Sequence, residues 1–162
     1  MKLSFIKKPN MNVAVIDNFY TPDELQAVMK ETKEIYKFRQ NPDRTGSATD
    51  EQSKFKKTGS GVFLYGLDPL IKCDLHYKHI QQSTLDDVLV NYYSSNEEYK
   101  AHCDVSYYTI LTLLKHGELK GGDIEFEELE ETVPFKENRA VIFPGCLTHR
   151  ALPSYGTGTR VS

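Results

Sequence analysis

The feature that most constrains the fold is a series of short β-favouring segments that fills the second half of the chain. Turn residues separate these segments, as at Gly121-Gly122 and Pro144-Gly145. Short strands interrupted this often tend to pair antiparallel with their neighbours, and they favour a sandwich or a barrel. The expected strands cover residues 85–93, 106–114, 123–127, 140–143 and 159–162.

The first half of the chain carries signals for both strand and helix. Residues 12–19 predict a short strand that enters a turn. A capping box of Thr21 and Glu24, with proline at the first helical position, predicts a helix over 22–38. A second helix is expected over 68–80. Helices followed by many strands predict an α+β fold in which the helices support one sheet.

Length and charge narrow the function classes. The 162 residues suit a single domain, 1–162, with helical support over about 20–80 and a β core over about 85–162. The net charge of −3 argues against a nucleic-acid partner, because such proteins usually carry a basic excess. No apolar run reaches the roughly 18 residues that a membrane helix needs, so we expect no membrane partner. The oligomeric state is left open.

Cysteine usage and the N-terminus predict a cytoplasmic protein. The three cysteines are odd in number and lack C-x-x-C spacing, which favours a reducing compartment over a disulfide framework. Lys7 and Lys8 stand where the apolar core of a signal peptide would run, so we do not expect secretion.

Two imidazoles and a carboxylate form a candidate metal site. In an extended chain His102 and Asp104 point to the same side, since residues i and i+2 share a face. His149 follows an apolar strand and a turn that could present it to the same pocket. Such a facial triad suits non-haem iron(II) and leaves coordination positions open. Zinc accepts the same ligands, so the triad alone leaves the metal undecided.

The end of the sequence favours iron. Arg160 offers the planar, two-pronged donor that would anchor the distal carboxylate of a keto acid. On a strand, Ser162 shares the face of Arg160, and its hydroxyl could bind the same carboxylate. The last expected strand reaches Ser162, so we expect it to continue past this sequence.

An ordered set of motifs covers most of the chain and resembles the 2-oxoglutarate/iron(II)-dependent dioxygenases, specifically their prolyl 4-hydroxylase-like branch. The resemblance implies a double-stranded β-helix (jelly-roll) core with N-terminal supporting helices. The matching segments are 17–19, 21–25, 90–93, 99–104, 109–114, 121–126, 138–145, His149 and 158–162.

The resemblance also implies roles for individual residues. His102, Asp104 and His149 would ligate iron(II), and Arg160 would pair with the C5 carboxylate of 2-oxoglutarate. The remaining residues implied to line the cosubstrate pocket are Tyr93, Asn91, Thr109, Leu111 and Leu113.

The implied reaction consumes 2-oxoglutarate and O2, releases succinate and CO2, and hydroxylates a C–H bond. Ascorbate is a candidate reductant. The implied substrate is a prolyl residue of a protein or peptide. Three alternatives remain: an alkylation-repair dioxygenase, which shares the Asn-x-Tyr spacing, a non-catalytic metal- or ligand-binding barrel, and a zinc hydrolase that would leave Arg160 unused.

Substrate contacts are the least constrained. The polar segment 39–61 has no apolar period and is expected to be a mobile lid that closes over a peptide. Tyr99 and Arg44 are expected near the entrance as substrate-binding residues. Tyr107 and Tyr108 are expected to pack within their strand, with a groove-lining role as the alternative.

Overall fold

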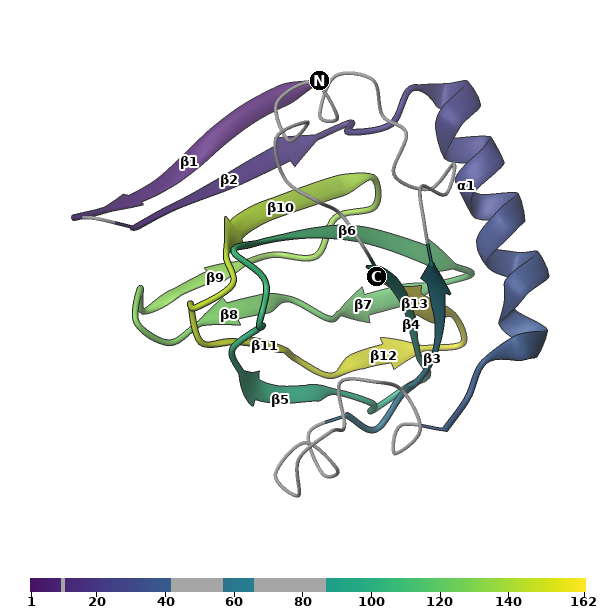
Figure 1. Ribbon diagram of the computed structural model, residues 1–162. Coiled ribbons are helices and arrows are strands. Elements are labelled where there is room, and N and C mark those ends of the chain that lie inside the picture. The colour runs from purple at the N-terminus through teal and green to yellow at the C-terminus, as the bar shows by residue number, and fades with distance from the viewer. Residues whose placement is uncertain (10, 42–56, 66–86) are drawn as a thin grey trace.

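The computed structural model describes residues 1–9, 11–41, 57–65 and 87–162. Two sheets face each other, and a single described helix lies alongside them (Figure 1). The larger sheet has seven antiparallel strands. In spatial order they are β1 (Lys2–Lys8), β2 (Met11–Asp17), β10 (Arg139–Pro144), β6 (Tyr108–His116), β13 (Thr159–Val161), β4 (Asp87–Tyr93) and β3 (Ser60–Tyr65).

The opposite wall consists of shorter strands. A four-stranded sheet has the spatial order β5 (Tyr99–His102), β11 (His149–Ala151), β8 (Ile124–Phe126) and β9 (Glu131–Val133). Strands β7 (Leu119–Gly121) and β12 (Ser154–Gly156) form a separate pair.

One buried cluster joins the two walls. It includes Leu113 and Phe143 from the larger sheet and Ile124 and Phe126 from the smaller one, all fully buried. Burying apolar side chains between two sheets is the main favourable contribution to such a fold. This architecture is a jelly-roll core, which confirms the α+β prediction.

The predicted capping box begins helix α1 (Pro22–Ile35). Thr21 Oγ1 accepts a hydrogen bond from Glu24 N at 3.4 Å, and Glu24 Oε2 accepts one from Thr21 N at 2.8 Å. A 3-10 turn over Tyr36–Phe38 completes the predicted 22–38 helix. Val28 packs into a second apolar cluster on the outer face of the larger sheet.

The two faces of strand β4 pack into two different apolar clusters. Val90 and Tyr92 belong to the cluster that packs with α1, whereas Tyr93 belongs to the cluster between the sheets. Asn91 shares the inward face of Tyr93, because side chains alternate along a strand. The residues predicted to line the cosubstrate pocket on this strand therefore point inward.

The prediction of a mobile lid over all of 39–61 is wrong at its described ends. Gln40 and Gly61 form an antiparallel bridge, Lys57 bridges to Tyr99, and β3 starts at Ser60. A Cβ on Gly59 would lie 2.4 Å from Tyr92 O, so this glycine permits close packing against β4. Residues 42–56 with Arg44, and the predicted helix 68–80, lie outside the described residues.

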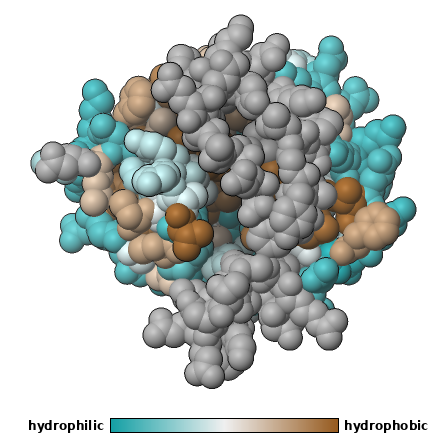
Figure 2. Space-filling model, in the orientation of Figure 1, coloured by the Kyte–Doolittle hydropathy of each residue, from teal (hydrophilic) through white to brown (hydrophobic). Residues whose placement is uncertain are grey.

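The first half of the chain supplies strands as well as the helix, since β1, β2 and β3 lie in the larger sheet. The division into helical support and β core stays a prediction. No helix of the described residues is long and apolar enough to cross a membrane. Hydrophilic side chains cover much of the coloured surface in Figure 2, and hydrophobic ones form small patches.

An ion pair holds β2 against β10 and gives a test of this sheet. Arg139 Nε lies 2.7 Å from Asp17 Oδ1, and Lys136 Nζ lies 2.9 Å from Oδ2. The hydrogen bond from Arg139 lowers the pKa of Asp17 to about 2, against the opposing effect of burial, and Lys136 adds to the lowering. A carboxyl with a lowered pKa stabilises the fold above its unfolded pKa, and this contribution is lost as the pH falls through the folded pKa.

We therefore expect Asp17→Asn to lower the free energy of unfolding at pH 7 by about 1–2 kcal/mol. The gap to the wild type should shrink as the pH falls from about 4 toward 2, because the unfolded state then binds a proton that the folded Asp17 takes up only near its own pKa of about 2. Urea unfolding at pH 7, 4 and 2.5 measures this, with exposed Glu118→Gln as the control. A gap that stays constant with pH would contradict the role of the ion pair.

Candidate metal centre and cosubstrate pocket

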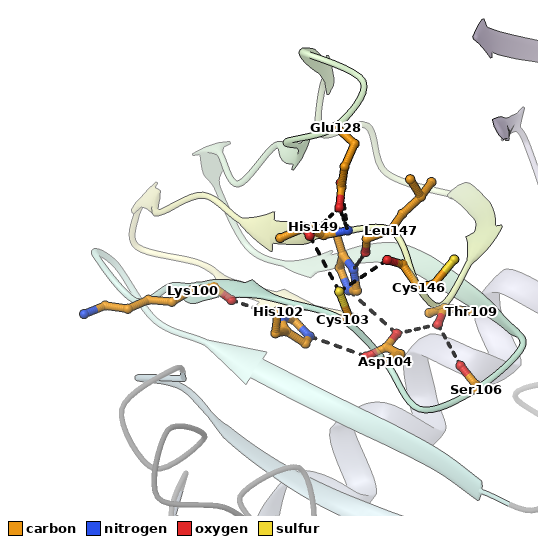
Figure 3. A network of polar contacts seen from close by, with 11 residues as sticks. Lys100, His102, Cys103, Asp104, Ser106, Thr109, Glu128, Cys146, Leu147 and His149 are labelled. Atoms are coloured by element: carbon orange, nitrogen blue, oxygen red, sulfur yellow. Dashed lines mark hydrogen bonds and ion pairs between the residues drawn. The ribbon is translucent and has the colours of Figure 1, made fainter. Parts of the chain in front are cut away.

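Antiparallel pairing of β5 with β11 brings the two predicted imidazoles together. His149 lies directly opposite His102 in the register. Asp104 follows two residues later, with Oδ1 3.5 Å from His102 Nε2 and Oδ2 3.7 Å from His149 Nε2. The three side chains face one another (Figure 3), and their ligand atoms all lie within 4.8 Å of each other.

Backbone carbonyls set the tautomer of both imidazoles. His102 Nδ1 lies 2.8 Å from Lys100 O, and His149 Nδ1 lies 2.9 Å from Leu147 O. A carbonyl oxygen only accepts, so each Nδ1 carries the hydrogen and donates it. The lone pair of each Nε2 is then free toward the centre, as metal coordination requires.

Asp104 is held from two sides. Its backbone N–H donates to Gly145 O at 2.8 Å, and Thr109 Oγ1 donates to Asp104 Oδ2. Burial raises the pKa of the Asp104 carboxyl, but its contact with the His102 imidazole and the hydrogen bond from Thr109 outweigh this effect and hold the pKa below its usual value. The carboxylate is therefore ionised and oriented. Thr109, predicted as part of the pocket wall, lies against this ligand.

Aromatic rings pack around both imidazoles. Tyr99 stacks on His102 with ring centroids 4.0 Å apart, and Phe143 meets His149 edge-on at 4.6 Å. Burial lowers the pKa of His149, which favours the neutral, metal-binding form. Tyr99 is only 7% exposed, so it lies beneath a metal ligand, although the sequence predicted it near the entrance.

Arg160 marks a second polar region inside the same barrel. It is 1% exposed, and none of its three guanidinium nitrogens has a hydrogen-bond partner in the described structure. Its Cζ lies 5.0 Å from the centroid of the Tyr93 ring. Burial lowers the pKa of Arg160 and raises that of the Tyr93 hydroxyl. The phenol thus remains a donor, and the guanidinium lacks an anion.

The other predicted pocket residues occupy the inner surface of the larger sheet. Leu111 and Leu113 share one face of β6, where Leu113 belongs to the inner cluster and Leu111 packs against it. Asn91 is buried and pairs through its backbone with Ser162, at 2.7 and 3.0 Å. The predicted pocket residues that the structure describes therefore lie on the inner side of the larger sheet. Their roles in binding stay predictions.

Solved structures with this fold give the comparison. The viral collagen prolyl hydroxylase vCPH from Paramecium bursaria Chlorella virus-1, in its 2OG complex, has a TM-score of 0.61 at 14% identity over 92% of both chains. A Pseudomonas putida prolyl-4-hydroxylase has 0.64 at 15% identity, covering 94% of this chain and 91% of that one. OsALKBH1 has 0.61 at 11% identity, covering 99% and 98%. No family model and no curated protein matches the sequence.

The chain has the fold of the 2-oxoglutarate- and iron(II)-dependent oxygenases. Two imidazoles and one carboxylate suit an iron(II) ion and leave positions open for further ligands. The free Nε2 lone pairs and the ionised Asp104 show that the residues fit such an ion.

Sequence reasoning missed two buried polar residues of this oxygenase fold. Ser154 is fully buried, and its Oγ has no hydrogen-bond partner in the described structure. A Cβ on Gly122 would lie 3.3 Å from Ser154 Cβ and 3.1 Å from Arg160 Cδ, so Ser154 and Arg160 border the same small space. Lys57 is the second missed residue. Nothing in the sequence indicated that either residue is buried, because Ser154 lies beside a short turn and Lys57 lies in a polar segment.

The triad predicts a graded loss of metal affinity. Asp104→Ala should weaken Co(II) binding by more than roughly 100-fold, because it removes a ligand, and Thr109→Val by roughly 10–100-fold, because it frees the carboxylate. Cys103→Ser is the matched control, since Cys103 stands between two of the ligands in the sequence and its thiol donates to Cys146 O at 3.3 Å (Figure 3). Calorimetric titration measures all three. Equal affinity in Asp104→Ala and Cys103→Ser would contradict the site.

Proposed function

We propose that this protein is a 2-oxoglutarate- and iron(II)-dependent oxygenase that hydroxylates a C–H bond of a prolyl residue in a peptide or protein. In the overall reaction one atom of O2 enters the substrate as a hydroxyl group. The other atom enters succinate, as 2-oxoglutarate loses CO2. The bound iron(II) supplies the activation of O2.

The observation that carries this proposal is the unpaired guanidinium of Arg160. An arginine enclosed in a barrel with no carboxylate beside it is costly unless an anion joins it. The charge of Asp123 raises the pKa of Arg160, but the Asp123 carboxylate already accepts a hydrogen bond from Phe135 N at 2.7 Å. A metal triad and an anion site within one barrel suit a keto acid that reaches from one to the other.

Each residue then has a defined task. Arg160 and the Ser154 hydroxyl hold the distal carboxylate of the keto acid, and the Tyr93 phenol remains protonated beside them. The triad holds the metal, and Thr109 fixes the orientation of Asp104. A zinc hydrolase would leave the Arg160 anion site without a role.

The surface beside the triad favours a peptide over a nucleic acid. Tyr107, just before β6, is 94% exposed, and Tyr108, the first residue of β6, is also exposed, so the prediction that they pack within their strand is wrong. Exposed aromatic faces provide flat apolar surface for a proline ring. Glu128 Oε2 accepts from Thr148 N at 2.9 Å, next to His149, and this carboxylate would repel a phosphate backbone.

A reducing compartment fits the same proposal. Cys103 and Cys146 are both free and exposed. Exposed thiols persist in the reduced form in the cytoplasm, which is the location we propose.

The first experiment tests for the reaction itself. The purified chain with iron(II), 2-oxoglutarate and O2 should release succinate and add a single oxygen to a proline-containing peptide, as seen by mass spectrometry. Methylated oligonucleotides serve as the competing substrate. Demethylation with no peptide product would favour the alkylation-repair alternative. Tight 2-oxoglutarate binding without succinate would favour a non-catalytic barrel.

Variants of the anion site should raise the KM for the cosubstrate and leave the KM for the substrate nearly unchanged. Arg160→Ala should raise the KM for 2-oxoglutarate by roughly 30-fold or more, because a charge-assisted pair is lost, and Arg160→Lys should recover only part of it. Ser154→Ala should raise the same KM several-fold. The KM for the peptide should change little in all three variants. An unchanged 2-oxoglutarate KM in Arg160→Ala would contradict the assignment.

The exposed tyrosines should act on the substrate alone. Tyr107→Ala with Tyr108→Ala should raise the peptide KM roughly fivefold or more, since apolar contact area is lost. Succinate formed without peptide should keep its rate. Tyr155→Ala is the matched control, because Tyr155 is also exposed but lies on β12. An equal effect of both sets of changes would refute the docking role.

A further inference from the structure

Lys57 is a second buried cation inside the barrel. It is 4% exposed, and its backbone bridges to Tyr99, the residue that stacks on the metal ligand His102. Its Nζ donates a hydrogen bond to Asn91 Oδ1 on the inward face of β4. A Cβ on Gly61 would lie 2.7 Å from Nζ, so the glycine leaves room for the amine.

Among the residues that the structure describes, no carboxylate forms an ion pair with Lys57. An ammonium has three N–H donors, and the neutral amide oxygen of Asn91 takes one of them. Burial lowers the pKa of Lys57 to about 7, and the charge of Glu97 opposes this only in part. An anion placed against the amine would favour its charged form.

The two unpaired cations share a neighbour. Lys57 Nζ lies 5.9 Å and Arg160 Cζ 5.0 Å from the centroid of the Tyr93 ring. The two charges are therefore at most about 11 Å apart. A short dicarboxylate can reach two cations at such a separation, either directly or through one bridging water.

We propose that Lys57, positioned by Asn91, binds the 1-carboxylate end of the keto acid, the end that Arg160 does not hold. This inference rests on the proposed function and assigns a second specificity-determining residue to the same pocket. The backbone contact of Lys57 with Tyr99 supports this end, because Tyr99 belongs to the strand that carries His102. A cation at each end makes the pocket selective for a dianion.

The test compares two ligands on the Mn(II)-loaded full chain, followed by water-proton relaxation of the metal. The first ligand, 2-oxoglutarate, has both carboxylates, and the second, 2-oxobutanoate, lacks the distal one. Lys57→Met should weaken both ligands by a similar factor of roughly tenfold or more, since one charge-assisted contact is lost from each. Arg160→Ala should weaken 2-oxoglutarate only. Lys120→Met, on the exposed surface of β7, should change neither.

A second variant keeps the test valid if Lys57→Met folds poorly. Asn91→Asp places a carboxylate against Lys57, so it should raise the melting temperature while it weakens the binding of both keto acids. Lys57→Arg, which keeps the charge, should retain more affinity than Lys57→Met.

The outcomes separate this inference from the proposed function. Unchanged binding in Lys57→Met or in Asn91→Asp would overturn the role of Lys57, and the proposed function would still stand if Arg160→Ala lost 2-oxoglutarate. Loss of 2-oxoglutarate alone in Lys57→Met would place Lys57 at the distal carboxylate and would also overturn the inference. A wild-type protein that binds neither keto acid would remove the proposed function itself.

Discussion

The buried, unpaired charge of Arg160 is the constraint on which the rest of this structure depends. Removing an ion from water costs several kcal/mol after relaxation, and the native state must supply that energy elsewhere. The Tyr93 ring, 5.0 Å away, offers a modest cation–π contact. The apolar clusters on the two faces of the larger sheet contribute the rest. An anion that pairs with Arg160 therefore stabilises the fold, and ligand binding and stability are linked.

The outer face of the larger sheet packs against the helix and stabilises the fold, whereas its inner face lines the proposed pocket. On β4, Tyr92 packs with the helix-side cluster and donates from its hydroxyl to Thr32 O at 2.6 Å, while Tyr93 faces Arg160. A shift of one residue in the register would exchange these faces. The packing of α1 on the outer face thus fixes which side chains reach the pocket, although the helix itself supplies none of the proposed site residues.

Local signals predicted the parts of this molecule that depend on local structure. The capping box at Thr21 fixed the start of α1, and the His102-x-Asp104 spacing brought two ligands together at the end of a strand. The approach of His149 depends on pairing between β5 and β11, which are distant in sequence. Its place after an apolar strand and a turn made it a candidate, and the family resemblance added it to the ligand set. The burial of Lys57 and Ser154 depends on tertiary contacts alone. Their neighbours in sequence are polar or turn-forming, which predicts exposure.

The two buried cations, Lys57 and Arg160, have the opposite sign to the net charge of the whole protein. The net charge is −3, and acidic side chains such as Glu127, Glu128 and Glu130 are exposed, where water and salt screen them. Lys57 and Arg160 lie in the interior, where the lower effective dielectric strengthens their attraction for an anion. An acidic protein can therefore select a dianionic ligand, because short-range interior charge decides what enters the pocket. The screened outer charge acts instead on large partners, and it disfavours those with a phosphate backbone.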